Sequence, residues 1–281
     1  MKNQKITDMI TGIPRLFRVE LAIFGMICVL IGGIIGGFDY LNETLIIAMI
    51  SVFFITSGSM GLNDYFDRDI DKKAHPDRPI PSGKITPMQG LTFSIILFSV
   101  SLMLSFFINT LCFIIAVITI DLLILYETIL KNQVIVGNMV VAFIIAISFI
   151  YGGASVGRPG VSLDFTALAF FLMLGREILM DVTDMEGDKL NRYTLPMRIG
   201  GRNATYIGCL FLFISILFLF LPGFIGIFPK YYLILILPVQ AILIYSIILP
   251  LIKTENTGRS ADLLLIAIAM GLPVFVFSII F

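Results

Sequence analysis

Long apolar runs follow one another along almost the whole chain, separated by shorter polar segments. Nine runs are about 20 residues long, the length that an α-helix needs to cross a bilayer; they cover residues 16–37, 44–63, 88–108, 110–130, 134–154, 163–182, 203–222, 231–251 and 261–280. Backbone polar groups in lipid must be hydrogen-bonded within their own segment, so each run is expected to be helical. The pattern predicts an all-α, polytopic membrane protein with nine transmembrane helices in one domain, residues 1–281.

The composition supports a membrane protein. Hydrophobic residues make up 58% of the chain, charged residues only 14%, and the mean hydropathy is +1.01, which is far more apolar than a soluble domain. The net charge of zero gives no reason to expect a nucleic-acid partner. Nothing in the sequence indicates an obligate protein partner. The three cysteines stand singly in apolar runs and are expected to be small core residues.

Basic residues are distributed unevenly between the predicted loops. We expect residues 1–15 to be a retained cytoplasmic segment before the first helix. With nine spans, sixteen of the 19 Lys and Arg residues then fall on the cytoplasmic side. Only Arg158 and Lys230 fall outside, and Arg176 lies within a helix. This asymmetry predicts a multi-pass protein of the cell membrane whose two long, charged loops, 64–87 and 183–202, face the cytoplasm.

Each of the two long loops begins with a set of oxygen ligands. Asn63, Asp67 and Asp71 recur every four residues and share one helix face if the second helix continues past the membrane boundary. A second set, Asp181, Asp184 and Asp188, is spaced i, i+3 and i+7 and also falls on one helix face. Mg²⁺ prefers oxygen ligands and often binds through carboxylates and substrate phosphates together. We therefore predict a Mg²⁺ and diphosphate site with catalytic residues Asn63, Asp67, Asp71, Asp181, Asp184 and Asp188, of which all but Asp181 are predicted metal ligands.

Other charged residues near these sets receive different interpretations. Asp64, Asp69 and Asp77 are expected to be solvated surface carboxylates. Several residues are placed where a diphosphate would need positive charge or a hydroxyl group, and they are the predicted substrate contacts Arg68, Lys72, Arg78, Tyr126 and Lys131. The roles of His75, Asp121 and Glu177 stay open.

The same segments carry a family resemblance. NDYFDRDID followed by RPIPSG, and DVTDMEGD followed by TLPMRIG, resemble the UbiA superfamily of intramembrane prenyltransferases. The resemblance implies helices around a central cavity with a cytoplasmic cap, and Mg²⁺-dependent transfer of a prenyl group from a prenyl diphosphate. It places the family's first motif on Asn63, Asp67 and Asp71 and the second on Asp184 and Asp188. It assigns diphosphate contacts to Arg68 and Lys131.

Within the superfamily, REILMDVTDMEGDK resembles the archaeal digeranylgeranylglyceryl phosphate synthases. That resemblance implies transfer of a geranylgeranyl group to geranylgeranylglyceryl phosphate, which forms the second ether bond of archaeal lipids. Such a lipid-like phosphate acceptor needs cations of its own, and Arg18, Arg192 and Arg198 are the predicted contacts, with Arg15 nearby. Membrane lipids are the remaining expected partners.

Two alternatives stay open at this stage. One is an aromatic prenyltransferase that acts on a quinone precursor. The other is a cation-coupled transporter, although transporters usually place their binding groups near the bilayer midplane, whereas these carboxylates lie at the ends of apolar runs.

Overall fold

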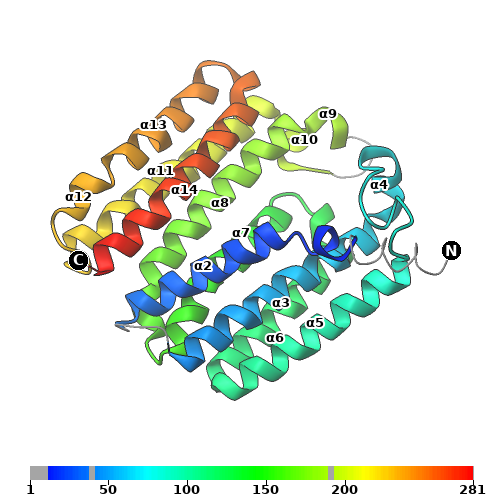
Figure 1. The fold of residues 1–281 in the computed structure, drawn as a ribbon. Coiled ribbons are helices and arrows are strands. Elements are labelled where there is room, and N and C mark those ends of the chain that lie inside the picture. Colours follow the sequence, from blue (N-terminus) through cyan, green and yellow to red (C-terminus); the bar gives the residue numbers. More distant parts are fainter. Residues whose placement is uncertain (1–11, 38–41, 189–192, 281) are drawn as a thin grey trace.

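The computed structural model describes residues 12–37, 42–188 and 193–280, and every regular element in these ranges is a helix (Figure 1). The predicted all-α class is confirmed.

Helices of 16 residues or more coincide with the nine apolar runs; in the described ranges they are α2 (Val19–Ile35), α3 (Glu43–Phe66), α5 (Pro87–Ile108), α6 (Thr110–Thr128), α7 (Val136–Ser155), α8 (Leu163–Thr183), α11 (Gly201–Phe224), α13 (Leu237–Ile252) and α14 (Thr257–Ile280). Shorter elements connect them: α4 (Arg68–Ala74), α9 (Met185–Asp188), α10 (Leu195–Ile199), α12 (Tyr232–Leu235), η1 (Leu130–Asn132), η2 (Pro159–Ser162) and η3 (Thr254–Asn256).

Six of the long helices in the described ranges are long and apolar enough to cross a membrane: α3, α5, α6, α7, α11 and the segment 254–278, which covers most of α14. A polytopic membrane protein is therefore confirmed. The other three differ for physical reasons. Helices α2 and α13 are shorter, with 17 and 16 residues, and α8 carries Arg176, Glu177 and Asp181. Nine spans stays a prediction.

The helices form two packed groups that meet at α2 and α7. One hydrophobic core joins α2, α3, α5, α6 and α7, and another joins α2, α7, α8, α11, α13 and α14. Helix α7 packs on both α2 and α8 (Figure 1). Its crossing with α2 is close: a Cβ added at Gly32 would clash with the Phe149 carbonyl, and one at Gly152 with that of Val29. Small residues allow helices in membranes to approach in this way.

Helices α3, α6 and α8 end at one end of the molecule, where α4, α9 and α10 also lie (Figure 1). The expected continuation of the second helix is interrupted at Asp67, which ends α3 and begins α4. Helical hydrogen bonds nevertheless cross the junction, because Asp67 N donates to the Asn63 carbonyl and Asp71 N donates to that of Asp67. The four-residue spacing therefore still places these side chains near one another.

Candidate active site

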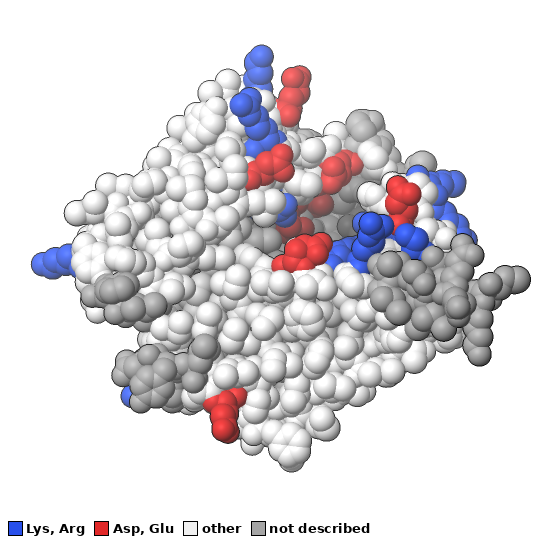
Figure 2. Space-filling view, viewed as in Figure 1, with Lys and Arg blue, Asp and Glu red and all other residues white. Residues whose placement is uncertain are grey.

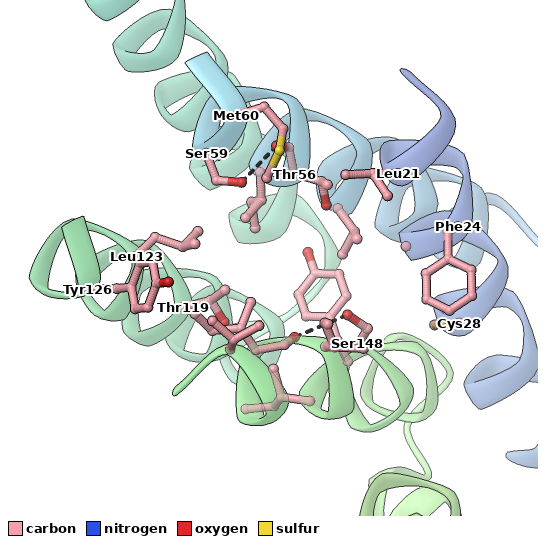
Figure 3. Close-up of a pocket in the computed structure, with 18 of the residues that line it drawn as sticks. Leu21, Phe24, Cys28, Thr56, Ser59, Met60, Thr119, Leu123, Tyr126 and Ser148 are labelled. Atoms are coloured by element: carbon pink, nitrogen blue, oxygen red, sulfur yellow. Dashed lines mark hydrogen bonds between the residues drawn. The ribbon is translucent and has the colours of Figure 1, made fainter. Parts of the chain in front are cut away.

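A cavity of about 400 Å³, here called the main cavity, lies between α2, α3, α6 and α7 (Figure 3). Its α3 wall runs from Val52 to Asn63, which corresponds to a depth of roughly 16 Å at the rise of an α-helix. Apolar side chains such as Phe24 and Leu123 line most of it, with a few hydroxyl groups among them. Charged and amide groups occupy one end: Arg18, Asn63, Glu127 and Glu177. The main cavity thus joins an apolar slot to a polar mouth.

The first predicted set forms a compact network at this mouth. The Asn63 amide donates to Asp67 Oδ2 and to Glu127 Oε1, both at 3.0 Å. Lys131 Nζ, on η1, donates to Asp67 Oδ1 at 2.6 Å and to Glu127 Oε2 at 2.9 Å. Burial by itself would lower the pKa of Lys131, but the hydrogen bonds to Asp67 and Glu127 raise it above its usual range. This amine therefore stays protonated between two carboxylates.

A second ion-pair network lies beside the first. Arg78, in the turn after α4, donates to Asp71 Oδ2 at 2.7 Å and lies 3.8 Å from Asp64 Oδ1. Arg18, just before α2, donates to the same Asp64 oxygen at 2.9 Å. The prediction of a solvated Asp64 is wrong, because its side chain is 1% exposed and lies under the two arginines. Asp69 and Asp77 are exposed, as expected.

Lys72 and Arg68 lie further out. Lys72 Nζ is 2.9 Å from Asp69, and both side chains are more than 60% exposed; this cation lowers the pKa of Asp69. Arg68 stacks over the Tyr65 ring, 4.9 Å from its centroid, and donates to the Tyr65 carbonyl at 2.8 Å. The structure therefore brings Arg18, Arg78 and Lys131 into the networks and keeps Arg68 and Lys72 at their edge.

The second predicted set is anchored differently. Asp181, on α8, accepts a hydrogen bond from the Asn138 amide of α7 at 2.8 Å. Asp184 caps the end of α8 and is exposed. The side chain of Asp188 and all of Arg192 lie outside the described residues, and Arg198 is exposed on α10. Acidic and basic side chains surround a hollow on the face shown in Figure 2.

Two members of the site went unnoticed in the sequence. Glu127 had a usable signal, because it stands four residues before Lys131 at the end of an apolar run, the spacing of a helical ion pair. Asn138 had no such signal, since only the packing of α7 on α8 explains its contact with Asp181.

Of the residues left open, Glu177 lines the main cavity and accepts a hydrogen bond from Arg176 at 2.9 Å, whereas Asp121 and His75 are exposed. Tyr126 lines the main cavity, as its assignment requires.

The donor chemistry of the first set suits Mg²⁺, which takes carboxylate and amide oxygens. Asp67 and Asp71 are both buried, and each is held by a cation in this structure, Lys131 and Arg78 respectively. Among the described residues, no group of three or more His, Cys, Asp or Glu side chains is gathered as a metal site.

Known proteins share both the sequence and the fold. The pattern of the UbiA prenyltransferase family matches residues 22–278. A digeranylgeranylglyceryl phosphate synthase of Thermococcus kodakarensis is 34% identical over 238 residues, which are 84% of this chain and 85% of the relative.

Solved structures of related proteins have the same fold. One from work on digeranylgeranylglyceryl phosphate synthase in membranes superposes with a TM-score of 0.84 at 30% identity, covering 97% of this chain and 99% of the other. A UbiA homologue from Archaeoglobus fulgidus bound to DMAPP and Mg²⁺ shares the fold, with a TM-score of 0.72 at 19% identity and coverage of 94% and 99%. Because the family pattern covers nearly the whole chain, this protein belongs to the UbiA prenyltransferase family.

Proposed function

We propose that this protein transfers a geranylgeranyl group from geranylgeranyl diphosphate to geranylgeranylglyceryl phosphate. The observation that carries the proposal is the combination of a deep apolar cavity with a buried Asp67–Lys131–Glu127 network at its mouth, in a chain similar to digeranylgeranylglyceryl phosphate synthases along most of its length. In this reaction the bond between the first prenyl carbon and the diphosphate oxygen breaks. An ether bond forms to the glycerol oxygen, and the hydroxyl proton is released.

The prenyl chain of the donor is assigned to the main cavity. Its apolar walls bury hydrocarbon, and its depth of roughly 16 Å suits an extended prenyl chain. The walls also exclude water, which protects the cationic prenyl carbon from hydrolysis. The diphosphate then lies at the mouth, beside Asn63 and Glu127.

The cations at the mouth stabilise the leaving diphosphate. Lys131 is protonated and fixed by two carboxylates, and Arg78 is fixed by Asp71. Such preorganised positive charge acts where negative charge develops, which is the condition for efficient electrostatic catalysis.

Mg²⁺ is part of the proposal. Asn63, Asp67, Asp71, Asp184 and Asp188 would hold it together with the diphosphate, because Mg²⁺ ordinarily binds through one or two carboxylates and substrate phosphates. When bound, it would neutralise the diphosphate and so assist its departure. The sixteen-to-two distribution of basic residues supports a cell-membrane protein with this site on the cytoplasmic side.

The deciding experiment supplies purified protein in detergent with Mg²⁺, geranylgeranyl diphosphate and a panel of acceptors, and detects products by mass spectrometry. We expect transfer to geranylgeranylglyceryl phosphate, loss of turnover with EDTA and recovery with added Mg²⁺. Turnover with 4-hydroxybenzoate and none with the glyceryl phosphate would show that the protein is an aromatic prenyltransferase. Cation uptake by proteoliposomes without any prenyl transfer would show that it is a transporter.

A further inference from the structure

A second cavity lies beside the main cavity. It has a volume of about 60 Å³ and is lined by residues of α2, α7, α8, α11, α13 and α14. The two cavities share a wall made of Phe24, Cys28 and Ile145. Every described residue that lines the second cavity is apolar, so it suits hydrocarbon and not a polar group.

An arginine continues the apolar face of α8 that lines this second cavity. Phe165, Ala169, Leu172 and Met173 line it, at the spacing i, i+4, i+7 and i+8 of one helix face. Arg176 follows at i+11 on the same face. Helical side chains lean toward the N-terminus of their helix, and along α8 this direction leads from Arg176 toward Leu172. Arg176 thus follows about one turn beyond Met173, the last α8 residue that lines the second cavity.

Arg176 also has unused hydrogen-bonding capacity. Its NH1 donates to Glu177 Oε1 at 2.9 Å, and the side chain is 17% exposed. Its Nε is buried and has no hydrogen-bond partner among the described residues. A buried donor without a partner is unfavourable, and the planar guanidinium matches the geometry of a phosphate.

We propose that the second cavity and Arg176 form the acceptor subsite. The prenyl tail of a prenylated glycerol phosphate enters the cavity, and its phosphate binds Arg176. This assignment rests on the proposed function and deepens it. A volume of about 60 Å³ holds only the start of such a tail, so the remainder displaces partly buried lining residues such as Leu172 and Leu272. Across the shared wall, the glycerol hydroxyl then lies beside the donor chain.

The first test blocks each cavity separately. A Cβ added at Gly271 would meet only Val239 and Phe275, at 3.7 and 3.9 Å, so Gly271→Leu extends into the second cavity without a backbone clash. Once the new leucine occupies this space, the acceptor tail would overpack the site, so we expect the acceptor KM to rise by about tenfold or more and the KM for geranylgeranyl diphosphate to change by less than about twofold. Ser148→Leu in the main cavity (Figure 3) is the matched variant, with the opposite pattern expected.

The second test concerns the cation. Arg176→Gln should weaken acceptor binding by roughly 10- to 100-fold, the range for loss of a charged hydrogen bond, and Arg176→Lys should restore part of it. Binding of radiolabelled geranylgeranylglyceryl phosphate to Mg²⁺-free protein gives a measurement independent of turnover. Size-exclusion chromatography in detergent identifies variants that do not fold; Gly271→Leu and Arg176→Lys keep the test available if Arg176→Gln is one of them.

The outcomes separate the two proposals. An acceptor KM that rises with Ser148→Leu and not with Gly271→Leu would overturn the acceptor subsite while leaving the transfer reaction intact. Equal effects of Gly271→Leu and Arg176→Gln on both substrates would do the same. An unaltered protein that neither binds nor prenylates the glycerol phosphate would overturn the proposed function, and the subsite with it.

Discussion

At the scale of single residues, Lys131 connects the two buried carboxylates at the mouth of the main cavity. Lys131→Met would leave Asp67 and Glu127 facing each other without a cation. Because a preorganised charge at the leaving group is lost, we expect prenyl-transfer kcat/KM to fall by about 100- to 1000-fold, with Lys131→Arg retaining part of the activity.

The control for Lys131 is Lys73→Met, which removes an exposed cation on α4. It should change kcat/KM by less than about twofold, since isolated surface charges contribute little. Equal losses in the Lys131 and Lys73 variants would show that general positive charge, and not the buried network, supports the reaction.

Asp64 carries a prediction about stability. Removing one partner of a buried ion pair typically costs about 3–5 kcal/mol, and because Arg18 is 24% exposed we expect Asp64→Ala to destabilise the protein toward the lower end of that range. Thermal unfolding in detergent measures the change. Asp69→Ala, at a side chain 71% exposed, should change stability by less than about 0.5 kcal/mol. A similar loss in both variants would contradict the burial of Asp64.

Individual residue roles could be predicted only where spacing defines them. The interval of four residues indicated that Asn63, Asp67 and Asp71 lie near one another, and the hydrogen bonds across the α3–α4 junction preserve that relation. Asp64 was misassigned because sequence position cannot reveal that Arg18 and Arg78 approach from distant segments. Whether the first set binds metal stays a prediction.

At the scale of helices, the close crossing of α2 and α7 supports both cavities, since each helix lines both. Gly152→Ala would force the Val29 carbonyl away and separate the two helices. Overpacking of this kind costs about 1–3 kcal/mol, so we expect a lower unfolding temperature in detergent. Gly160→Ala is the control, because an added Cβ there meets nothing within 4 Å; if it lowered the temperature equally, the crossing would not be the cause.

Helix existence followed from the apolar runs because lipid allows few other structures. The run at 134–154, for example, becomes α7 at Val136–Ser155. The short helix α10 was missed because its five residues are too few for a periodic pattern, and α4, with seven residues, was anticipated only as a continuation of the second helix.

At the scale of the whole molecule, the family assignment fixes the architecture, and the reading of the chain as one domain stays a prediction. The orientation and the number of spans also stay open to experiment, because α2, α8 and α13 fall outside the six candidate spans of the described ranges. Charge distribution predicts the orientation from Lys and Arg alone, and helix length alone cannot decide whether 16 or 17 residues cross a bilayer.

Single-cysteine labelling resolves both questions. The native cysteines Cys28, Cys112 and Cys209 are buried and should give little background when intact. Exposed positions lie between the long helices or in their first turn, and the variants are Arg15→Cys, Glu43→Cys, Asp77→Cys, Arg158→Cys, Arg202→Cys, Lys230→Cys and Glu255→Cys. If all nine helices span the membrane, cysteines at positions 15, 77, 202 and 255 label only from the cytoplasm, and the other three only from outside.

Because α5, α6 and α7 separate Asp77 from Arg158, these two positions must label from opposite sides in any case. Arg202 labelling on the same side as Arg158 would show that α8 does not cross. Lys230 and Glu255 on one side would show the same for α13, and Arg15 and Glu43 on one side for α2.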